Sequence, residues 1–447
     1  MFRRQIAICA LTLSSALTSA APGTPPERTL AISHVNVIDV VEGRIIPNST
    51  VTIRGMTITS VMQNGSVPAD ATVIDGRGKF LVPGLWDMHS HVGGGTSLTA
   101  WHAAWLKLYV ANGVTGIRDM GSDLDLILEM RAATAARRVL GPRIFTAGPI
   151  LDDAPGDWPL RMRVKTAQDG TAAVQLLKQR GVDLIKVHDH TPHEAFYAIA
   201  KEARHQGLPL AGHVPLGLTV EQVIDAGQGD IEHLSNLQLW KPCSGGKQYR
   251  PDACRPFFEM LARRGIWQTP TLVAMSEVAT LGTPASRVSA DELAYASKSL
   301  KNGWAANQRA FSPTPEIIEE LRTGAEVGAV VTKDMADSGV GILAGCDMMI
   351  AGFCVYDELV AMVRGGMSPL AALRTATLNP ARYFGIQQTA GSVAPGKRAD
   401  LVLLDANPLT DITNLRRITA IVVAGRFLNR KVLDELLAEV KTAAEQT

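Results

Sequence analysis

The chain has 447 residues, of which 46% are hydrophobic and 19% charged, a composition too apolar for an intrinsically disordered protein. Lysine and arginine number 44 and aspartate and glutamate 43, so the net charge of +1 provides no broad field to attract a polyanion. These figures argue against nucleic acid as a partner. A chain of this length can bury a large core, and barrels of alternating strands and helices commonly form one unit of about 250 residues.

The first twenty residues have the pattern of a secretory signal peptide. Arg3 and Arg4 precede an apolar run over residues 6–17, and small residues follow up to Ala20. The run is shorter than the ~20 residues that a membrane-spanning helix needs. We therefore expect cleavage of residues 1–20, no membrane contact afterwards, and a periplasmic or secreted protein. The alternative is an uncleaved membrane anchor.

Four cysteines would remain after this cleavage. Cys243 and Cys254 enclose a sequence of loop composition, and an exported chain meets oxidising conditions, so we expect a disulfide between them. Two free thiols are the alternative. Cys346 and Cys354 lie in apolar surroundings and are expected to be buried thiols.

Short segments rich in valine, isoleucine and threonine occur near both ends of the chain and indicate strands. These segments are Leu30–Val40, Ser49–Arg54, Ala71–Asp75, Asp400–Leu404 and Thr419–Val423. The similar composition of these segments predicts that residues 28–80 and 390–430 pair into one small β-sandwich domain.

Between these ends, over residues 81–389, a strand followed by an amphipathic helix recurs. The candidate strands are Leu85–Val92, Val114–Met120, Arg143–Gly148, Asp183–Asp189, Leu208–Val214, Asp230–Leu234, Ile266–Leu272 and Gly341–Asp347. Pro192 and the acid after it open a helix, and Gly181, Gly207 and Gly265 stand where helices stop. Eight such units predict an α/β fold, a TIM-like (β/α)8 barrel with its active site at the C-terminal ends of the strands. The segment from Ala274 to about Thr323 is interpreted as a partly helical insertion that could cover the barrel mouth.

Residues of metal-ligand type gather at these strand ends. His89 and His91 are two positions apart on one strand and face the same side, so both can reach one ion. A His-x-His pair alone is a weak signal, since it arises often by chance. Four further residues strengthen it because each stands at the end of another predicted strand: Lys186, His213, His233 and Asp347.

In these candidate ligands and in three further motifs, the chain resembles the amidohydrolase superfamily of metal-dependent hydrolases in its two-metal form. The resemblance covers nearly everything after the signal peptide. It rests on the Pro-Gly-x-x-Asp-x-His-x-His entry at residues 83–91, on Asn-Pro-Ala-Arg at 379–382, and on the segment from Gly391 to Leu401.

The resemblance implies two divalent metal ions, with zinc expected. In the superfamily pattern, His89, His91 and Asp347 bind one ion and His213 and His233 bind the other. Lys186, carboxylated at its amine, bridges the two. The resemblance also implies that a metal-bridged hydroxide attacks the substrate and that Asp347 transfers its proton to the leaving group.

Within the superfamily, the chain resembles the branch of imidazolonepropionase-like enzymes and Xaa-Pro or Xaa-Arg dipeptidases. Residues 357–359 (Asp-Glu-Leu), 365–366 (Gly-Gly) and 377–380 (Thr-x-Asn-Pro) carry this resemblance. It implies hydrolysis of a C–N bond in a small amide-type molecule. An exported metallodipeptidase is the nearest alternative, but His213 is followed by Val-Pro-Leu-Gly, without the aromatic hydroxyl residue often found there in those dipeptidases. A non-catalytic metal-dependent binding protein is a third possibility, which the complete ligand set opposes.

Several other polar residues near the strand ends have two interpretations. Arg118 and Asp119 end the second predicted strand, where they either contact substrate or form a structural ion pair. His188 shares the strand parity of Lys186 and is a candidate for the pocket wall. In the superfamily pattern, Asp87 supports the first strand.

Overall fold

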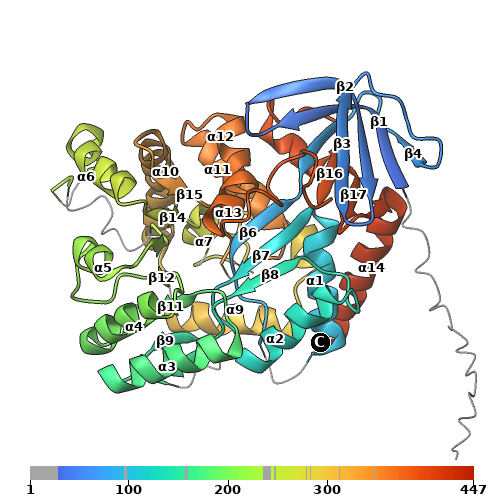
Figure 1. Ribbon diagram of the computed structural model, residues 1–447. Helices are drawn as coiled ribbons and strands as arrows, with labels where there is room; N and C mark the ends of the chain where they lie inside the picture. Colours follow the sequence, from blue (N-terminus) through green and yellow to red (C-terminus); the bar gives the residue numbers. More distant parts are fainter. Residues whose placement is uncertain are drawn as a thin grey trace, which may run out of the picture.

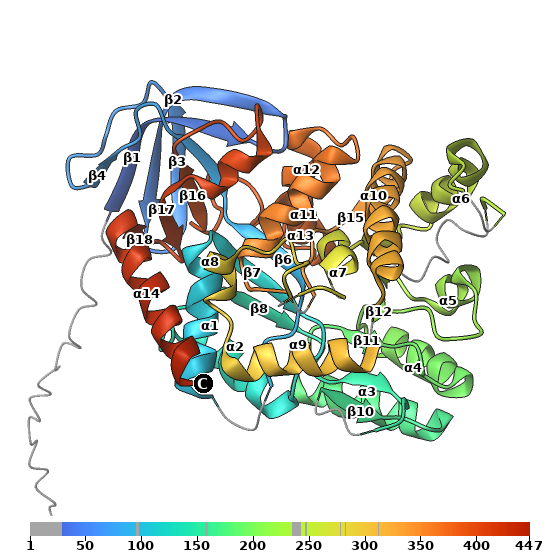
Figure 2. The same ribbon diagram turned by 180° about the vertical axis from the view of Figure 1, so that it is seen from behind.

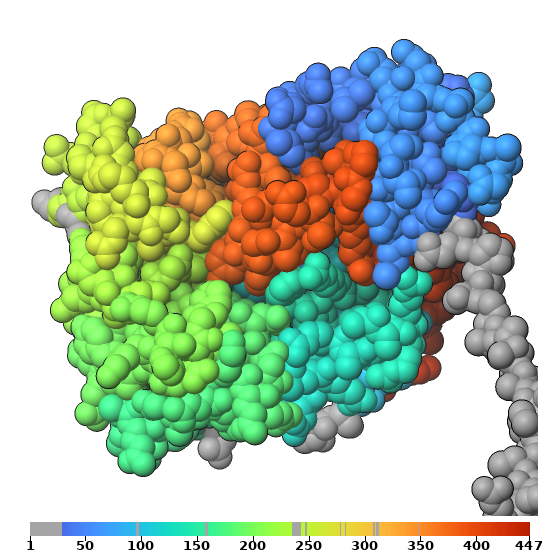
Figure 3. Space-filling model, viewed as in Figure 1, coloured from blue at the N-terminus to red at the C-terminus, as the bar shows by residue number. Residues whose placement is uncertain are grey.

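The structure, a computed structural model, describes residues 29–94, 98–156, 160–234, 243–245, 248–277, 279–281, 283–311, 313–347 and 349–447. The predicted signal peptide lies outside the described residues. Figure 1 shows a sheet in blue and red beside a larger body of alternating strands and helices, and Figure 3 shows that the two form one continuous surface. Within the described ranges, no helix combines the length and the apolar character needed to span a membrane.

Strands from both ends of the described chain form one eight-stranded sheet. Their order is β18-β17-β16-β5-β1-β2-β3, with β4 beside β1. The bounds are β1 Thr29–Asp39, β2 Arg44–Arg54, β3 Thr57–Gln63, β4 Thr72–Asp75, β5 Phe80–Pro83, β16 Leu401–Leu404, β17 Ile418–Val423 and β18 Arg426–Asn429. The two ends join where β5 pairs antiparallel with β16. The predicted pairing of the chain ends is therefore confirmed, and residues 81–83 belong to this sheet rather than to the barrel.

This end sheet bends around an apolar core of its own. Val37 and Val51 come from its N-terminal half and Leu403 and Val422 from its C-terminal half, and all four lie in one buried cluster. A backbone bridge between Thr57 and Arg398 connects the far edge to the segment before β16. The end domain is thus a sheet folded over a shared core, as a small sandwich requires.

The larger body contains the eight predicted barrel strands. They are β6 Leu85–Ser90, β7 Val114–Asp119, β8 Arg143–Thr146, β11 Ile185–Val187, β12 Leu210–Gly212, β13 Asp230–Glu232, β14 Trp267–Thr269 and β15 Gly341–Ile342. Neighbouring strands pair in parallel. Strand β8 is connected to the start of the β11 segment, where the amide of Asp183 donates to the carbonyl of Thr146 at 2.9 Å. The segment after β15 is connected to β6, where the amide of Met88 donates to the carbonyl of Ala344 at 2.8 Å. The barrel is therefore closed, as the sequence predicted.

Helices surround the barrel and follow its strands. Their bounds are α1 Ala100–Ala111, α2 Leu124–Ala135, α3 Ala167–Arg180, α4 His193–His205, α5 Val220–Ala226, α6 Pro251–Arg263, α11 Phe353–Arg364, α12 Pro369–Thr375 and α13 Leu378–Tyr383. Helix α4 begins after Pro192, and Gly181 ends α3 in the left-handed conformation that favours glycine. Both boundaries agree with the sequence signals. The last helix, α14 Arg430–Gln446, packs along α1.

Two segments add to the barrel. Short strands β9 Ile150–Asp152 and β10 Arg161–Arg163 follow β8. Between β14 and β15 lie α7 Leu272–Glu277, α8 Ala290–Leu293, α9 Lys298–Phe311 and α10 Pro315–Asp337. Figure 2 shows α8 and α9 in the foreground, with α9 running from the neighbourhood of α1 towards α4. Buried Glu358 accepts hydrogen bonds from the first amides of α7, at Leu272 and Val273, and so fixes the start of this insertion.

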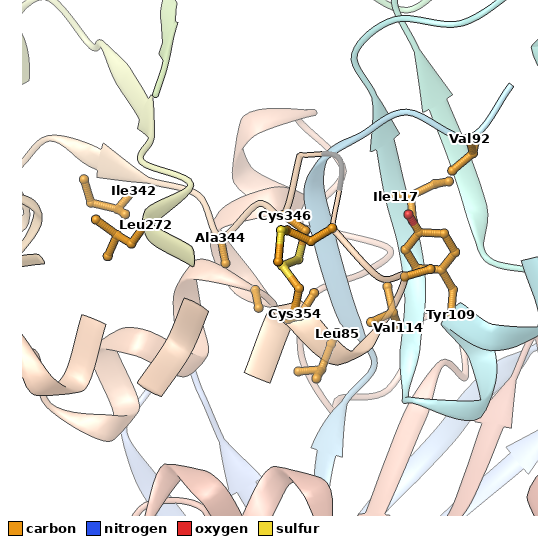
Figure 4. Packing of buried hydrophobic residues seen from close by; sticks show 14 of the residues in the cluster. Leu85, Val92, Tyr109, Val114, Ile117, Leu272, Ile342, Ala344, Cys346 and Cys354 are labelled. Carbon is orange, nitrogen blue, oxygen red and sulfur yellow. A yellow bond between two sulfur atoms is a disulfide. The ribbon is translucent and has the colours of Figure 1, made fainter. Parts of the chain in front are cut away.

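Two disulfides are present in the structure. Cys243 is bonded to Cys254, in agreement with the expected pairing. Cys346 is bonded to Cys354, so the expectation of two buried thiols there was wrong. Figure 4 shows this second disulfide in the core close to Ala344 and Leu85. Apolar surroundings suit a thiol and a disulfide equally, and only the return of the chain at the start of α11 brings the two Cα atoms within 5.8 Å.

Replacing Cys346 and Cys354 together by alanine should lower the free energy of unfolding by about 2–4 kcal/mol, because the cross-link restricts the unfolded chain. Denaturant unfolding of the oxidised protein measures this change. The pair Cys243 and Cys254, which closes a loop of similar length, is the matched control and should lose a comparable amount. Recovery of Cys346 and Cys354 as free thiols in peptides mapped without reduction would contradict the structure.

Candidate active site

The structure brings the six predicted ligand residues together at the C-terminal end of the barrel. They come from five strands or the segments after them: His89 and His91 from β6, Lys186 from β11, His213 from the end of β12, His233 from the end of β13, and Asp347 from the segment that follows β15. His89 and Lys186 are each 1% exposed, and the other histidines are buried or nearly so. The convergence expected from a (β/α)8 barrel is therefore found.

Asp347 lies in the middle of the histidines. Its Oδ1 atom is 3.3 Å from His91 Nε2 and 3.7 Å from His89 Nε2. The ring of His233 is 4.6 Å from that of His89 and 4.7 Å from that of His213, measured between centroids. The four imidazoles and one carboxylate thus form a continuous cluster.

Each of the four imidazoles is held through its Nδ1 atom by a group behind it. The partners of Nδ1 are Glu232 for His89 at 2.6 Å, the carbonyl of Gly121 for His91 at 2.8 Å, Asp189 for His213 at 3.0 Å and the Thr271 hydroxyl for His233 at 2.7 Å. A carboxylate or carbonyl can only accept, so Nδ1 carries the hydrogen in the first three. The Nε2 lone pair is then directed away from the supporting group, which is the arrangement of metal-binding histidines.

The electrostatic environment keeps most of these imidazoles neutral. Burial lowers the pKa of His89 to about 4 and that of His233 to about 3, and burial together with the charge of Lys186 holds the pKa of His213 well below its usual value. Burial would also lower the pKa of His91, but its hydrogen bond to Asp347 raises it overall. Neutral imidazoles beside a carboxylate are the ligands that Zn²⁺ and similar cations take. The residues therefore fit a divalent metal.

Two groups of residues have ligand atoms within 4.8 Å of one another. One comprises His89, His233 and Asp347, and the other His188, Asp189 and His213. The first group places His233 with the residues that the resemblance assigned to the other ion. The ring of His188 stacks on that of His213 with centroids 3.9 Å apart, so His188 does lie at the edge of the site.

Lys186 is fully enclosed by the barrel. Burial lowers the pKa of its amine, while the charges of Glu232 and Asp347 act in the opposite direction. Among the described residues, the histidines of the site pair with Asp347, Glu232 and Asp189, and no ion pair includes Lys186. A lysine with a lowered pKa presents a larger fraction of the neutral amine, which is the form that reacts with electrophiles.

Arg118 supports this cluster through Glu232, the residue that contacts His89. Its guanidinium is completely buried, pairs with both Asp230 and Glu232, and lies 2.9 Å from the Thr269 hydroxyl. Its Nε atom donates to the carbonyl of Met88 at 2.6 Å. Of the two interpretations left open for Arg118, the structural ion pair is therefore correct. Asp119 is structural as well, because it is buried and accepts hydrogen bonds from the Val92 amide and from the hydroxyls of Ser122 and Thr146.

Glu232 is the functional residue that the sequence analysis missed. Burial would raise its pKa, but the charge of Arg118 and the hydrogen bond from His89 lower it below the usual value, so the carboxylate stays ionised. The available signal was the alternation of Asp230 and Glu232 on one face of a buried strand, which requires a buried cation opposite.

The backbone is strained where the strands end. Asp347, His233 and Thr271 have φ angles of 57°, 63° and 50°, in the left-handed region that residues other than glycine seldom adopt. Asp87 connects strand β6 to the turn at Asp347, because it accepts hydrogen bonds from the amides of His89 and Cys346 at 3.1 and 3.0 Å. This is the supporting role that the superfamily pattern implies for Asp87.

His91 and Asp347 line a cavity of about 670 Å³. Trp101 and Trp105 of α1 form part of its wall, and Trp304 of α9 forms another part. Helix α9 belongs to the insertion between β14 and β15, so the predicted position of this insertion at the barrel mouth agrees with the lining of the cavity.

The comparison with known families decides the class of protein. Residues 80–428 match the amidohydrolase family. The chain belongs to this family. This confirms the resemblance seen in the sequence, and the chain is accordingly a hydrolase.

Known relatives cover most of the chain at low identity. The ochratoxinase of Aspergillus niger is 24% identical over an alignment that covers 86% of this chain and 83% of the relative. An adenine deaminase of Chelativorans sp. is also 24% identical, over 88% of this chain but only 57% of the deaminase. Among solved structures, the bottromycin amidohydrolase superposes with a TM-score of 0.74 at 24% identity, over 94% of this chain and 91% of that one, which supports the fold.

Replacing Arg118 by methionine should lower the free energy of unfolding by about 3–5 kcal/mol, because it leaves two buried carboxylates without their cation. Arg131 to methionine is the matched control: its pair with Asp183, whose side chains are each 28% exposed, should contribute less than about 1 kcal/mol. Chemical denaturation of both variants measures the difference. Equal losses would show that Arg118 is not the central support of the site.

Proposed function

We propose that this hydrolase cleaves a carbon–nitrogen bond of a small amide-type molecule with the help of two divalent cations, with zinc expected. The residues that would hold them are His89, His91, Asp347, His213 and His233. The observation that carries this proposal is the support of the imidazoles through Nδ1. In His89, His91 and His213 it leaves Nε2 available as a ligand atom, and the Nε2 atoms of His89 and His91 lie beside Asp347. Bound cations would supply Lewis acidity, lowering the pKa of water towards neutrality and polarising the scissile carbonyl.

We further propose that Lys186 carries a carboxylate group. Carbon dioxide adds to the neutral Nζ amine, one proton leaves, and the product presents two anionic oxygens in place of a cation. Burial among neutral imidazoles favours the neutral amine that this addition needs. The carboxylated side chain of Lys186 would add an anionic ligand to those that the histidines and Asp347 supply.

Asp347 is the residue of this chain that we assign to proton transfer. Burial would raise its pKa, but the contact with His91 and the charges of the neighbouring histidines hold it well below its usual value. Its side chain is 27% exposed, so the carboxylate faces the cavity. It can accept the proton of the attacking water and pass it to the leaving nitrogen, which then departs as a neutral amine.

Relatives named amidohydrolase, deaminase and Xaa-Pro dipeptidase support a carbon–nitrogen bond as the target. An exported metallodipeptidase remains the second candidate, since solved structures of that kind share the fold. The Val-Pro sequence after His213 disfavours it. Membership of a hydrolase family disfavours a purely binding role.

We also propose that the protein works outside the cytoplasm. The pattern of residues 1–20 indicates export, and the two disulfides fit an oxidising compartment such as a periplasm.

A substrate panel tests the proposed function. The purified protein, loaded with two equivalents of Zn²⁺, should hydrolyse at least one member of a set of simple amides, lactams and N-acyl amino acids faster than it hydrolyses matched esters. Dipeptides test the second candidate. Turnover of dipeptides alone would replace the first proposal by the second, and turnover of esters alone would overturn both.

Asp347 to asparagine should lower kcat by about 10² to 10⁴-fold with a smaller change in KM, because the amide keeps the size and one oxygen but accepts no proton at neutral pH. Metal content measured on the same sample is the control, since loss of an ion would explain inactivity without proton transfer. If the variant holds its metal and works within about tenfold of the original enzyme, Asp347 is a ligand only.

A further inference from the structure

A second cavity, of about 710 Å³, lies between the end domain and the barrel. Helix α2, strand β8 and the loop that joins them line its barrel side, and the turn before β3, the segment before β16 and the start of β18 line the other side. Figure 3 shows the teal surface of the barrel meeting blue and orange-red surfaces on one face of the molecule. Strand β8 begins at this cavity, whereas the candidate active site lies where the strands end, so the two sites are separate.

This cavity has a strong excess of positive charge. Among the described residues that line it, Asp183 is the one acid, and five are arginines: Arg131, Arg137, Arg143, Arg398 and Arg426. Over the full sequence, basic and acidic residues are almost equal in number. The excess is therefore a local property of the cavity, and it favours an anionic ligand there.

Two of the five arginines are neutralised by neighbouring acids. Arg131 Nη1 lies 2.9 Å from Asp183 Oδ2, and Arg398 Nε lies 2.7 Å from Asp400 Oδ2. The other three form no ion pair with any described residue. Three guanidinium groups around one cavity are thus left without a counter-charge, and such groups repel one another.

Arg143 is the least exposed of the three unpaired arginines. Its guanidinium carbon lies 4.7 Å from the centroid of the Phe145 ring, and its N–H groups donate no hydrogen bond to any described residue. Burial, and after it the charge of Arg398, lowers the pKa of Arg143, while the charges of Asp400 and Asp183 act in the opposite direction. A guanidinium offers parallel N–H groups that match the paired oxygens of a phosphate or a carboxylate.

We propose that this cavity binds a small polyanion with two or more phosphate or carboxylate groups, and that Arg143 is its principal contact, assisted by Arg137 and Arg426. Three uncompensated cations require more than one negative charge to balance them. The volume lies in the range of pockets for small molecules, which often occur between domains. Arg143 belongs to the barrel and Arg426 to the end domain, so the ligand would connect the two. The proposal does not depend on the reaction at the active site.

Calorimetric titration of the zinc-loaded full chain with pyrophosphate and with citrate, at constant ionic strength, tests the proposal. At least one of the two should bind about tenfold or more tightly than its counterpart with a single group, phosphate or acetate. Arg143→Gln, which keeps hydrogen-bond donors but removes the charge, should weaken that binding by about tenfold or more. Arg426→Gln should weaken it by about threefold or more, and since Arg426 is exposed, this variant serves if Arg143→Gln does not fold.

Arg138→Gln is the matched control, because Arg138 is exposed, directly follows Arg137 and does not line the cavity. It should change the affinity by less than about twofold. Both probes can also contact the cations of the active site, but this contribution is the same in every variant because the cavity lies at the other end of the barrel. The bound probe should raise the thermal midpoint of the original protein and not that of Arg143→Gln.

The results also identify the ligand chemistry. Binding of pyrophosphate alone would indicate a phosphate ligand and binding of citrate alone a carboxylate ligand, and either result supports the site. The proposal fails if phosphate and acetate bind as tightly as the two larger anions, or if the affinity is the same in the original protein, Arg143→Gln and Arg426→Gln. An equal loss in Arg138→Gln would also overturn it, since general charge attraction would then account for the binding.

Discussion

The buried charge of Arg118 is the interaction on which the site depends. It holds Glu232 in the ionised form inside the barrel, and Glu232 in turn accepts the Nδ1 hydrogen of His89. The hydrogen bond to Glu232 fixes the tautomer of His89 and directs its Nε2 towards Asp347. Burying the side chains of Arg118, Asp230 and Glu232 costs free energy unless each charge is paired, so the network is stable only when all three are present. Strands β6, β7 and β13 must therefore be in register before the first ligand is correctly placed.

Much of the fold was predictable because each barrel strand is a short apolar segment between helix signals, and the ligands stand where those segments end. The strands β3, β5 and β18 were not predicted, since a strand such as β3, with the sequence Thr-Ile-Thr-Ser-Val-Met-Gln, is largely exposed and its pattern alone does not separate it from a loop. The role of Arg118 was undecided because an ion pair depends on what a distant strand places opposite it. The same holds for Cys346 and Cys354, whose bond follows from a turn of the chain.

The two sides of the cavity have different origins in the chain. The barrel strands supply the imidazoles and Asp347, whose positions are fixed by backbone pairing and by the supporting groups behind them. The insertion supplies Trp304 through α9, and its composition carried no motif from which a role could be predicted. This division is expected of a fold that supports many reactions, in which the strand ends perform the chemistry and the connections select the substrate.

Diffraction at the zinc absorption edge, from crystals of the zinc-loaded protein, tests the central claim most directly. The account predicts two anomalous peaks, one against His89, His91 and Asp347 and the other against His213 and His233. Density for the carboxylated side chain of Lys186 should lie between them. A single peak held by His188, Asp189 and His213, with none at Asp347, would contradict it.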